Sequence, residues 1–377
     1  MAGLRRGRGT GNTVEPCIDP SSFSNIITAQ ATRRRASATP SRCRCGKLRG
    51  PHLRGDAVEL AAVRVGTYAR RCNLTETDCW LFEWLWSESK SATTTIILLI
   101  LATILSVRGA DAEPMQLIVN GQARAFLLER PIVQGPRPTI IMLHGAGRRA
   151  ADIAQDSGLA QLAPREGLVA VFPEGRGSRW NFFPPGKESA KDVQFFQQHG
   201  GLPDDVGFLK ILVADLVRRG VSDPKRIYLS GLSLGGVMAL RMACVDAGSF
   251  AAIGLLISAM AELTGASCQP AKPLPILMVN GTADQMLPYA GGQSIRGDSL
   301  WSAERLVGFF RRLNGCAEAA QQSVLPGTHP RRIEIERSTR CSGGPVVLYR
   351  IVGGGHDVPP GLNAGQVLLD FFRDKVR

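Results

Sequence analysis

The sequence of residues 113–377 predicts an α/β fold: a mostly parallel, twisted sheet with helices on both faces. Apolar runs alternate with segments whose apolar residues recur at helical spacing, as expected when strands and helices alternate along a chain. Nearly all of these runs are apolar at successive positions, which is typical of strands covered on both faces. No internal repeat or glycine–serine linker divides the region, so we expect one domain.

The expected strands begin with an antiparallel hairpin. Residues 115–131 hold two β-rich runs joined by Asn120-Gly121, the dipeptide that a type I′ hairpin turn favours. Further apolar runs predict buried strands within residues 138–147, 168–172, 226–236, 251–260, 275–284 and 346–351.

Four segments have the apolar spacing of helices. The first is opened by Asp204-Asp205 and runs to residue 219, with Asp204 as its cap and Asp223-Pro224 marking its exit. The other three are expected from the glycine-rich turn at 231–235 through Cys244, over 301–313 and over 364–373.

Residues 1–112 differ in texture from the rest. The net charge of the chain is +13, and this first third carries more than half of it, with arginine clusters at 5–8 and 33–35. Residues 1–89 show no sustained helical or strand period, so we expect an Arg-rich upstream segment that is disordered or results from a mis-assigned start. Such charge favours nucleic acid or an anionic membrane surface, but residues 113–377 are only mildly basic for their length, so neither is an expected partner.

Residues 90–112 have the features of a signal peptide. Lys90 precedes a charge-free run whose dense apolar core is 13 residues long, and Ala110-Asp111-Ala112 fits a cleavage site. A bilayer-spanning helix needs about 20 residues. Because a long segment precedes this run, two explanations stay open: a membrane anchor with a cytoplasmic extension, or a start site placed too early. We favour the second, against which stands the absence of methionine between Met1 and Met115.

The cysteines do not predict a metal site. Cys43 and Cys45 lack the spacing and the second pair of a zinc site. In residues 113–377, four cysteines allow three disulfide connectivities; chain order favours Cys244–Cys268 and Cys316–Cys341, and four reduced thiols remain an alternative. No phosphate loop or dinucleotide fingerprint occurs, so neither a metal nor a cofactor is expected.

Gly231-Leu232-Ser233-Leu234-Gly235 matches the G-x-S-x-G nucleophile motif, with a predicted strand before it and a predicted helix after it. The sharp turn needs small flanking residues and exposes the serine at a helix N-terminus. A chance glycine turn is the alternative. In this context Ser233 is the candidate nucleophile.

The order serine, acid, histidine selects the partners of Ser233. His356 follows a predicted strand and three glycines, whereas His329 lies in a turn between polar stretches. Asp284 ends the predicted strand at 275–284, whereas Asp298 lies deeper in a glycine-rich loop. We therefore expect His356 as the base and Asp284 as the residue that orients it, with a loop-capping histidine and a turn aspartate as the alternatives.

His144-Gly145-Ala146-Gly147 follows the third predicted strand and suits an oxyanion loop. The backbone N–H groups of Ala146 and Leu234 are the expected donors to a tetrahedral oxyanion. A glycine turn that merely closes the strand is the alternative.

Taken in order, LHGAG, FPEG, Arg179-Trp180-Asn181, DDVGFL, DPKRIYLSGLSLGG, NGTAD and GGGHD resemble the poly(3-hydroxybutyrate) depolymerase and feruloyl/acetyl-xylan esterase family of secreted α/β-hydrolases. The resemblance spans about residues 115–375. It implies the α/β-hydrolase fold, hydrolysis of carboxylic esters by the triad Ser233, Asp284 and His356, and placement of Trp180 and Asn181 near the acyl pocket. Many relatives carry cysteine at the positions of Ala146 and Arg179.

We therefore expect a secreted or periplasmic serine esterase acting on soluble hydroxyalkanoate oligomers or small aryl or sugar esters. An uncleaved signal would instead anchor the hydrolase domain outside the cytoplasm, and without such an anchor no stable membrane partner is expected. Another activity of this scaffold (peptidase, thioesterase or acyltransferase) and a non-catalytic binding protein are the competing hypotheses. Oligomeric state, ester specificity and action on polymer remain open.

Overall fold

The structure is a computed structural model that describes residues 113–133, 135–317, 319–327 and 329–377. The predicted upstream segment (1–89) and the predicted signal peptide (90–112) therefore lie outside the described residues. Among the helices that are described, none is both long and apolar enough to span a bilayer.

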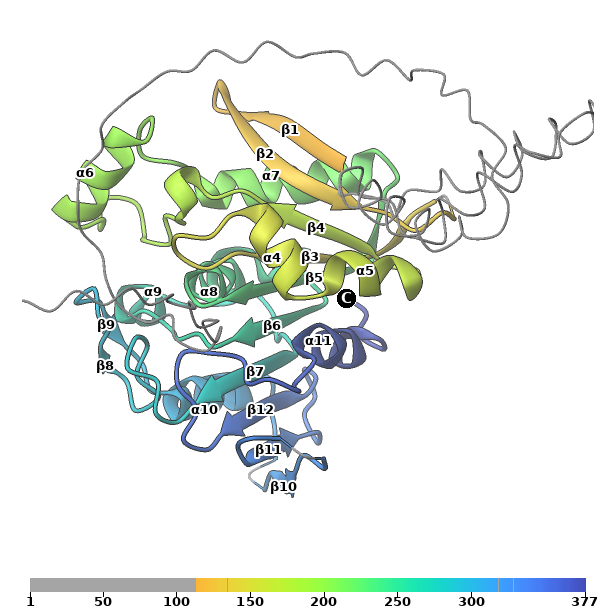
Figure 1. Cartoon of the computed structure of the whole chain (residues 1–377), viewed down its shortest axis with the longest axis vertical. Helices are drawn as coiled ribbons and strands as arrows, with labels where there is room; N and C mark the ends of the chain where they lie inside the picture. The colour runs from red at the N-terminus through yellow and green to blue at the C-terminus, as the bar shows by residue number, and fades with distance from the viewer. Residues whose placement is uncertain (1–112, 134, 318, 328) are drawn as a thin grey trace, which may run out of the picture. The chain divides into compact units, whose positions relative to one another are not determined.

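The described chain is organised around a sheet of ten strands with the order β1-β2-β4-β3-β5-β6-β7-β12-β11-β10 (Figure 1). The six central strands, from β4 to β12, pair in parallel, and antiparallel strands extend the sheet at both edges. The bounds are β1 Glu113–Val119, β2 Gln122–Glu129, β3 Arg137–Leu143, β4 Val169–Pro173, β5 Ser222–Leu232, β6 Ala252–Leu256, β7 Ile276–Gly281, β10 Gln321–Val324, β11 Ile333–Ser338 and β12 Val346–Ile351. This is the α/β-hydrolase fold that the sequence predicts.

The N-terminal hairpin forms as predicted. β1 pairs antiparallel with β2, and Val119 faces Gln122 across the two-residue turn. Asn120 and Gly121 both have positive φ (51° and 77°), as a type I′ turn requires. The turn dipeptide therefore sets the register of this edge of the sheet.

Helices cover both faces of the sheet, because successive residues of a buried strand point to opposite sides. In β3, Ile141 and Leu143 join the core under helices α7 (Asp205–Arg218), α8 (Leu234–Asp246) and α10 (Ala303–Leu313). Ile140 and Met142 join the core on the other face, under α4 (Ala150–Asp156), α5 (Leu159–Arg165) and α11 (Ala364–Phe372). Shorter elements complete the domain: α6 Ala190–Gln198, α9 Glu262–Ala266, β8 Gly292–Gln293, β9 Ser299–Leu300 and two single 3₁₀ turns, Arg176–Ser178 and Ala247–Ser249.

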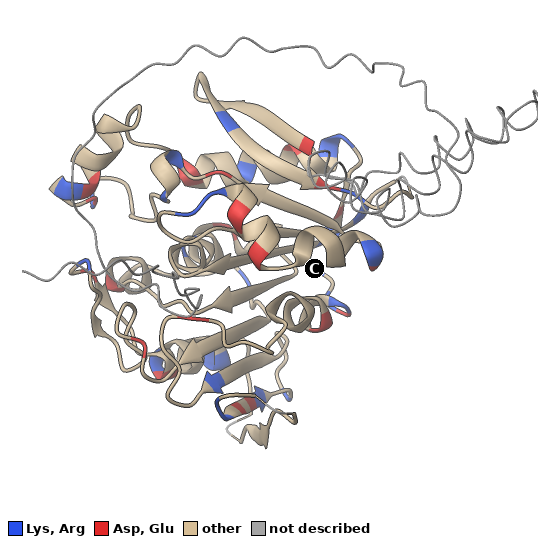
Figure 2. Ribbon diagram, in the orientation of Figure 1, with Lys and Arg blue, Asp and Glu red and all other residues tan. Residues whose placement is uncertain are grey.

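Charged residues are excluded from the centre of the sheet. Strands β4, β6 and β7 carry no Lys, Arg, Asp or Glu, and Figure 2 shows charge on the helices, the loops and some of the other strands. Burying an unpaired charge costs far more than burying an apolar side chain, which explains the uninterrupted apolar runs of the sequence.

The helix expected after Asp204 forms, and its end lies one residue earlier than expected. The side chain of Asp204 does cap α7, accepting from Gly207 N–H at 2.7 Å, but the helix ends at Arg218 and Asp223-Pro224 lies at the start of β5. Proline is tolerated there because the pairing of β3 with β5 shifts from Ser222 to Ile227, so no ladder bond needs the missing proline N–H.

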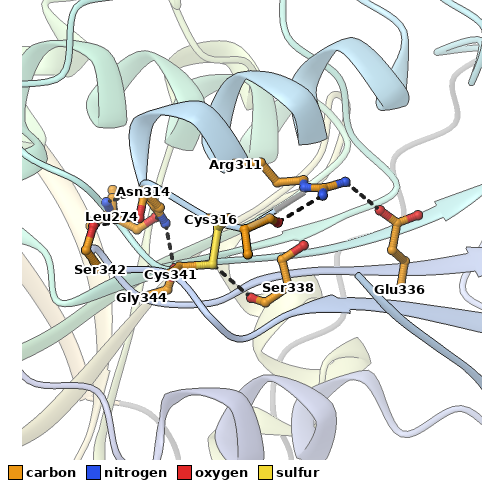
Figure 3. The surroundings of a disulfide bond; sticks show 10 residues. Leu274, Arg311, Asn314, Cys316, Glu336, Ser338, Cys341, Ser342 and Gly344 are labelled. Carbon is orange, nitrogen blue, oxygen red and sulfur yellow. Dashed lines mark hydrogen bonds and ion pairs between the residues drawn. A yellow bond between two sulfur atoms is a disulfide. The ribbon is translucent and has the colours of Figure 1, made fainter. Parts of the chain in front are cut away.

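Both disulfides suggested by chain order are present, Cys244–Cys268 and Cys316–Cys341. Figure 3 shows the second, which joins the end of α10 to the turn between β11 and β12. Beside it, the buried Asn314 amide donates to the Leu274 carbonyl at 2.9 Å and accepts from the Leu274 N–H at 3.0 Å. The disulfide and the amide together fasten α10 to the edge of the sheet.

Candidate active site

Ser233 stands on a strained turn between β5 and α8. Its φ and ψ are 53° and −119°, a conformation that costs about 1–3 kcal/mol and persists only where the surroundings impose it. A Cβ on Gly231 would lie 2.2 Å from the carbonyl carbon of Gly235, and one on Gly235 would lie 2.3 Å from the Leu143 oxygen. Both glycines of the motif are therefore required by backbone approaching backbone, which presents Ser233 at the carboxyl edge of the sheet.

Two residues that the sequence analysis did not single out support this turn. The Ser258 hydroxyl donates to the Ser233 carbonyl at 2.9 Å, and Asn280 Nδ2 donates to the Ser258 carbonyl at 2.8 Å. Ser258 follows β6, and Asn280 lies in the neighbouring strand β7. In the sequence, Ser258 and Asn280 are marked only as polar residues near the ends of apolar runs.

The structure brings Ser233, His356 and Asp284 into one hydrogen-bonded chain. His356 Nε2 lies 2.8 Å from Ser233 Oγ, and His356 Nδ1 lies 2.7 Å from Asp284 Oδ2. Asp298, the rejected acid, is bonded within its own loop, where its amide donates to Ser294 Oγ at 3.1 Å.

Asp284 is held as a carboxylate. Burial acts to raise its pKa, but the hydrogen bond with His356 and the N–H groups of Leu287 and Met286 outweigh burial and bring the pKa below its usual value. Those two amides donate to Oδ1 at 2.9 and 2.8 Å, leaving Oδ2 for the histidine. The aspartate is thereby fixed in position as well as in charge.

Adjacent parallel strands explain how residues 72 positions apart in the chain meet. β7 pairs with β12, so the loops that follow them start side by side. The Ala283 N–H donates to the Gly354 carbonyl at 2.8 Å, and a Cβ on Gly281 would lie 2.4 Å from the oxygens of Gly354 and Gly355. The absence of a side chain at Gly281 therefore lets the loop of His356 pack directly over the loop of Asp284.

Residues 144–147 form a loop beside Ser233. A Cβ on Gly145 would lie 3.5 Å from the Ser233 Cβ. Within the described part of the chain, the N–H groups of Ala146 and Leu234 form no hydrogen bond, and both residues line the same cavity as Ser233. The two expected oxyanion donors are thus unpaired and close to the nucleophile.

The loop is held from behind by His144, which is fully buried. Its Nε2 accepts from the Gly175 N–H at 2.9 Å, and its Nδ1 lies 2.8 Å from the Gly145 carbonyl, to which it donates. Removal from water lowers the pKa of His144, which keeps the ring neutral. A neutral ring with one donor and one acceptor matches both contacts.

A cavity of about 470 Å³ opens above Ser233. Its wall combines the 144–147 loop, the segment after β4, helix α6 and the loop between β7 and α10. The wall is mostly apolar. Its main side chains are Phe182, Phe195, Val237, Met286, Leu287, Ile295 and Leu300. A concave apolar site with a few converging polar groups has the form of a small-molecule site.

Comparison with known proteins agrees with this geometry. The family model described as esterase PHB depolymerase matches residues 125–268. Over this region the chain is similar to the PHB depolymerase/feruloyl esterase-like family. It is accordingly a carboxylic ester hydrolase.

The alignments with relatives of this esterase cover different shares of the relatives' lengths. NocK from Nocardia uniformis subsp. tsuyamanensis, whose esterase activity is itself inferred, is 29% identical over 68% of this chain and 76% of its own. Feruloyl esterase B from Piromyces equi is 30% identical over 58% of this chain and 39% of its own. A solved structure of acetyl xylan esterase from Aspergillus awamori aligns with a TM-score of 0.49 at 14% identity, covering 69% of this chain and 99% of that one.

In this esterase, Trp180 and Asn181 lie beside the cavity and are not among the residues that line it. The buried Trp180 donates from Nε1 to the His144 carbonyl at 2.9 Å. The Asn181 N–H donates to Asp205 Oδ2 at 2.7 Å, and its Nδ2 donates to the Pro203 carbonyl at 3.1 Å. These contacts hold the 144–147 loop and the start of α7, so the structure places both residues in support of the site.

The residues that do contact the cavity were largely missed. Arg179 stood out in the sequence only as a departure from relatives, and Phe195 lies in helix α6, which we did not expect. Among the described residues, no group of three or more His, Cys, Asp or Glu side chains is placed to hold a metal ion.

Proposed function

We propose that this esterase is a serine hydrolase whose catalytic triad is Ser233, His356 and Asp284, acting through an acyl-enzyme intermediate. The observation that carries the proposal is the hydrogen-bonded chain from Ser233 Oγ through His356 to Asp284, with steps of 2.8 and 2.7 Å. A serine hydroxyl is a weak nucleophile until an adjacent base takes its proton, and these distances suit that transfer.

In the acylation half-reaction, His356 Nε2 accepts the Ser233 proton as Oγ attacks the ester carbonyl carbon. Asp284 stabilises the imidazolium that forms and fixes the tautomer with Nδ1 protonated. Collapse of the tetrahedral intermediate breaks the bond to the alcohol oxygen, which leaves with the proton from His356. Water, deprotonated by the same nitrogen, then attacks the acyl-enzyme and releases the acid.

The negative charge of each tetrahedral intermediate falls on the former carbonyl oxygen. The N–H groups of Ala146 and Leu234 are the proposed donors to it, and Leu234 adds the positive end of helix α8, of which it is the first residue. Each such donor lowers a barrier by about 3 kcal/mol. Because neither N–H has a competing acceptor within the described chain, both are available before substrate arrives.

Soluble hydroxyalkanoate oligomers and small aryl or sugar esters are the proposed substrates. The volume of about 470 Å³ and the mostly apolar wall suit a molecule of that size. Relatives named feruloyl esterase point to the same range of esters.

We also propose that residues 90–112 direct export and are removed after Ala112. Both the apolar core of 13 residues and the Ala110-Asp111-Ala112 sequence support this. N-terminal sequencing of the native protein should then read Glu113-Pro114-Met115. Recovery of Met1 on an active, membrane-bound enzyme would contradict both the cleavage and the suspected start site.

Single substitutions test the catalytic proposal. Ser233→Ala and His356→Ala should each lower kcat for 4-nitrophenyl butyrate by at least about 10⁴-fold, because members of a triad act as a unit. Ser267→Ala, which changes a serine at the exposed end of α9, is the matched control and should keep wild-type kcat. Half of the wild-type activity in either site variant would rule out the triad.

A further inference from the structure

Arg179 is a cation in the cavity wall without an acidic partner. It lines the cavity together with Ser233 and His356. Within the described residues, its side chain forms no ion pair or hydrogen bond, and its guanidinium lies 3.7 Å over the centre of the Phe195 ring. Stacking engages the flat face of a guanidinium and leaves the five N–H groups at its edge free.

The position of Arg179 is fixed from several sides. Its N–H donates to the Arg176 carbonyl at 3.2 Å, and its own carbonyl oxygen packs so closely on Gly175 that a Cβ there would lie 2.3 Å away. The next residue, Trp180, is buried. The Phe195 ring under the guanidinium is stacked in turn on His199, with 4.2 Å between ring centres. The cation is therefore held in place before any ligand binds.

The surroundings leave this charge without full compensation. Burial, the largest effect, and then repulsion from Arg296 lower the pKa of Arg179, and Asp192 offsets them only in part. Asp192 is itself engaged by Arg296 in an ion pair. Asp298, an acidic side chain of the wall, lies 3.4 Å from the Ser294 hydroxyl in its own loop. A partly buried guanidinium with free donors favours an incoming anion.

We propose that Arg179 binds a carboxylate of the substrate, so that the preferred esters are anionic. This inference rests on the proposed esterase function and narrows it. Two kinds of ester present such a group. In a hydroxyalkanoate oligomer with a free acid end, the carboxylate belongs to the alcohol that leaves. In a half-ester of a dicarboxylic acid, it belongs to the acyl group that is transferred to Ser233.

Matched pairs of substrates test this. We compare kcat/KM for the 3-hydroxybutyrate dimer and its methyl ester, and for 4-nitrophenyl hydrogen adipate and its methyl-capped form. The wild-type enzyme should prefer the acid in at least one pair by about 10- to 100-fold, the range of a hydrogen bond to a charged group. The pair that shows the preference identifies which side of the ester carries the carboxylate.

Three variants assign the preference to the side chain. Arg179→Met should abolish the acid-to-neutral ratio, and Arg179→Lys, which keeps the charge but not the planar fork, should retain part of it. Arg165→Gln is the control, because it removes one exposed charge at the end of α5, ahead of β4 and away from the carboxyl edge of the sheet, and should leave the ratio unchanged. An unaltered ratio in Arg179→Met, or a wild-type enzyme that prefers both neutral esters, overturns the inference.

Failure of the inference and failure of the proposed function give different results. If Arg179 has no such role, neutral esters are still hydrolysed in a Ser233-dependent manner and only the ratio is unaffected. If the chain hydrolyses no ester, the function fails, and calorimetric titration with adipate decides the inference alone. Wild-type protein should then bind adipate and Arg179→Met should not; equal binding, or none to either, overturns it.

Discussion

Gly235→Ala should damage stability and activity together, because this glycine lets α8 approach the 144–147 loop. The new Cβ would lie 2.3 Å from the Leu143 oxygen and 2.6 Å from the His144 oxygen. Both contacts are backbone atoms, so no side-chain rotation relieves them. Overpacking of this kind lowers the free energy of unfolding by about 1–3 kcal/mol. Because two backbone atoms are contacted, we expect a loss of about 3 kcal/mol for this variant. At about 2–4 °C per kcal/mol for a domain of this size, Tm should fall by roughly 6–12 °C.

Calorimetry and ester hydrolysis measure the two effects on one protein. Moving the loop by about 1 Å displaces the proposed oxyanion donors. We therefore expect kcat to fall by about 10²-fold. Gly248→Ala is the matched control, since that glycine has no atom within 4 Å of a new Cβ and no positive φ; its free energy of unfolding should change by less than about 0.5 kcal/mol. A Gly235→Ala protein with wild-type Tm and kcat would refute the packing argument.

Four further outcomes are expected. Asp284→Asn should lower kcat by about 10⁴-fold, whereas Asp298→Asn should have little effect; the reverse result would show that the wrong acid was assigned. Folding lowers the pKa of Asp284, so the ionised carboxylate stabilises the folded state. This stabilisation is complete above about pH 4 and is lost as the pH falls further. The Tm difference between wild type and Asp284→Asn should therefore shrink in acid. Replacing Cys316 and Cys341 by alanine opens a loop spanning 25 residues and should cost about 3 kcal/mol in a denaturant titration, and a loss below 1 kcal/mol would contradict a structural role. Gly308→Ala, within α10 and without close backbone contacts, should instead stabilise by about 0.5–1 kcal/mol, and a lower Tm would show that the site is more crowded than described.

The buried strands and the turn at Ser233 were predictable because their signals are local. A strand covered on both faces must be apolar at successive positions, and β12 coincides with the expected range 346–351. The strained turn needs glycine at 231 and 235, so five consecutive residues determine the geometry of the turn. Chain order, together with position just after a predicted strand, then selected Asp284 and His356, which lie within hydrogen-bonding distance of each other.

The edge of the sheet and the small helices were not predictable in the same way. Strand β10, residues 321–324, is exposed throughout, and β11 alternates only partly, so neither forms an apolar run. Helix α6 contributes few buried residues, among them Phe196 and Asp192. Such elements are stabilised by tertiary contacts rather than by their own pattern, and these contacts are invisible in the sequence.

The cavity wall could not be predicted because its residues come from segments far apart in the chain. Arg179 and Phe195 meet through a guanidinium–ring contact, which no spacing rule anticipates. Trp180 lies near the cavity, as the resemblance implied, but its indole bonds to the His144 carbonyl behind the loop and does not line the cavity. Packing decides which of two neighbouring residues faces the substrate.

Covalent labelling of Ser233 tests the central claim most directly. An alkyl fluorophosphonate reacts with a serine that an adjacent base activates, and mass spectrometry of the digested protein locates the adduct. One phosphonyl group per chain should be found on Ser233, and Ser233→Ala and His356→Ala proteins should not be labelled at the same reagent concentration. An adduct on a different serine, or full ester hydrolysis by a protein that resists labelling, would contradict the account.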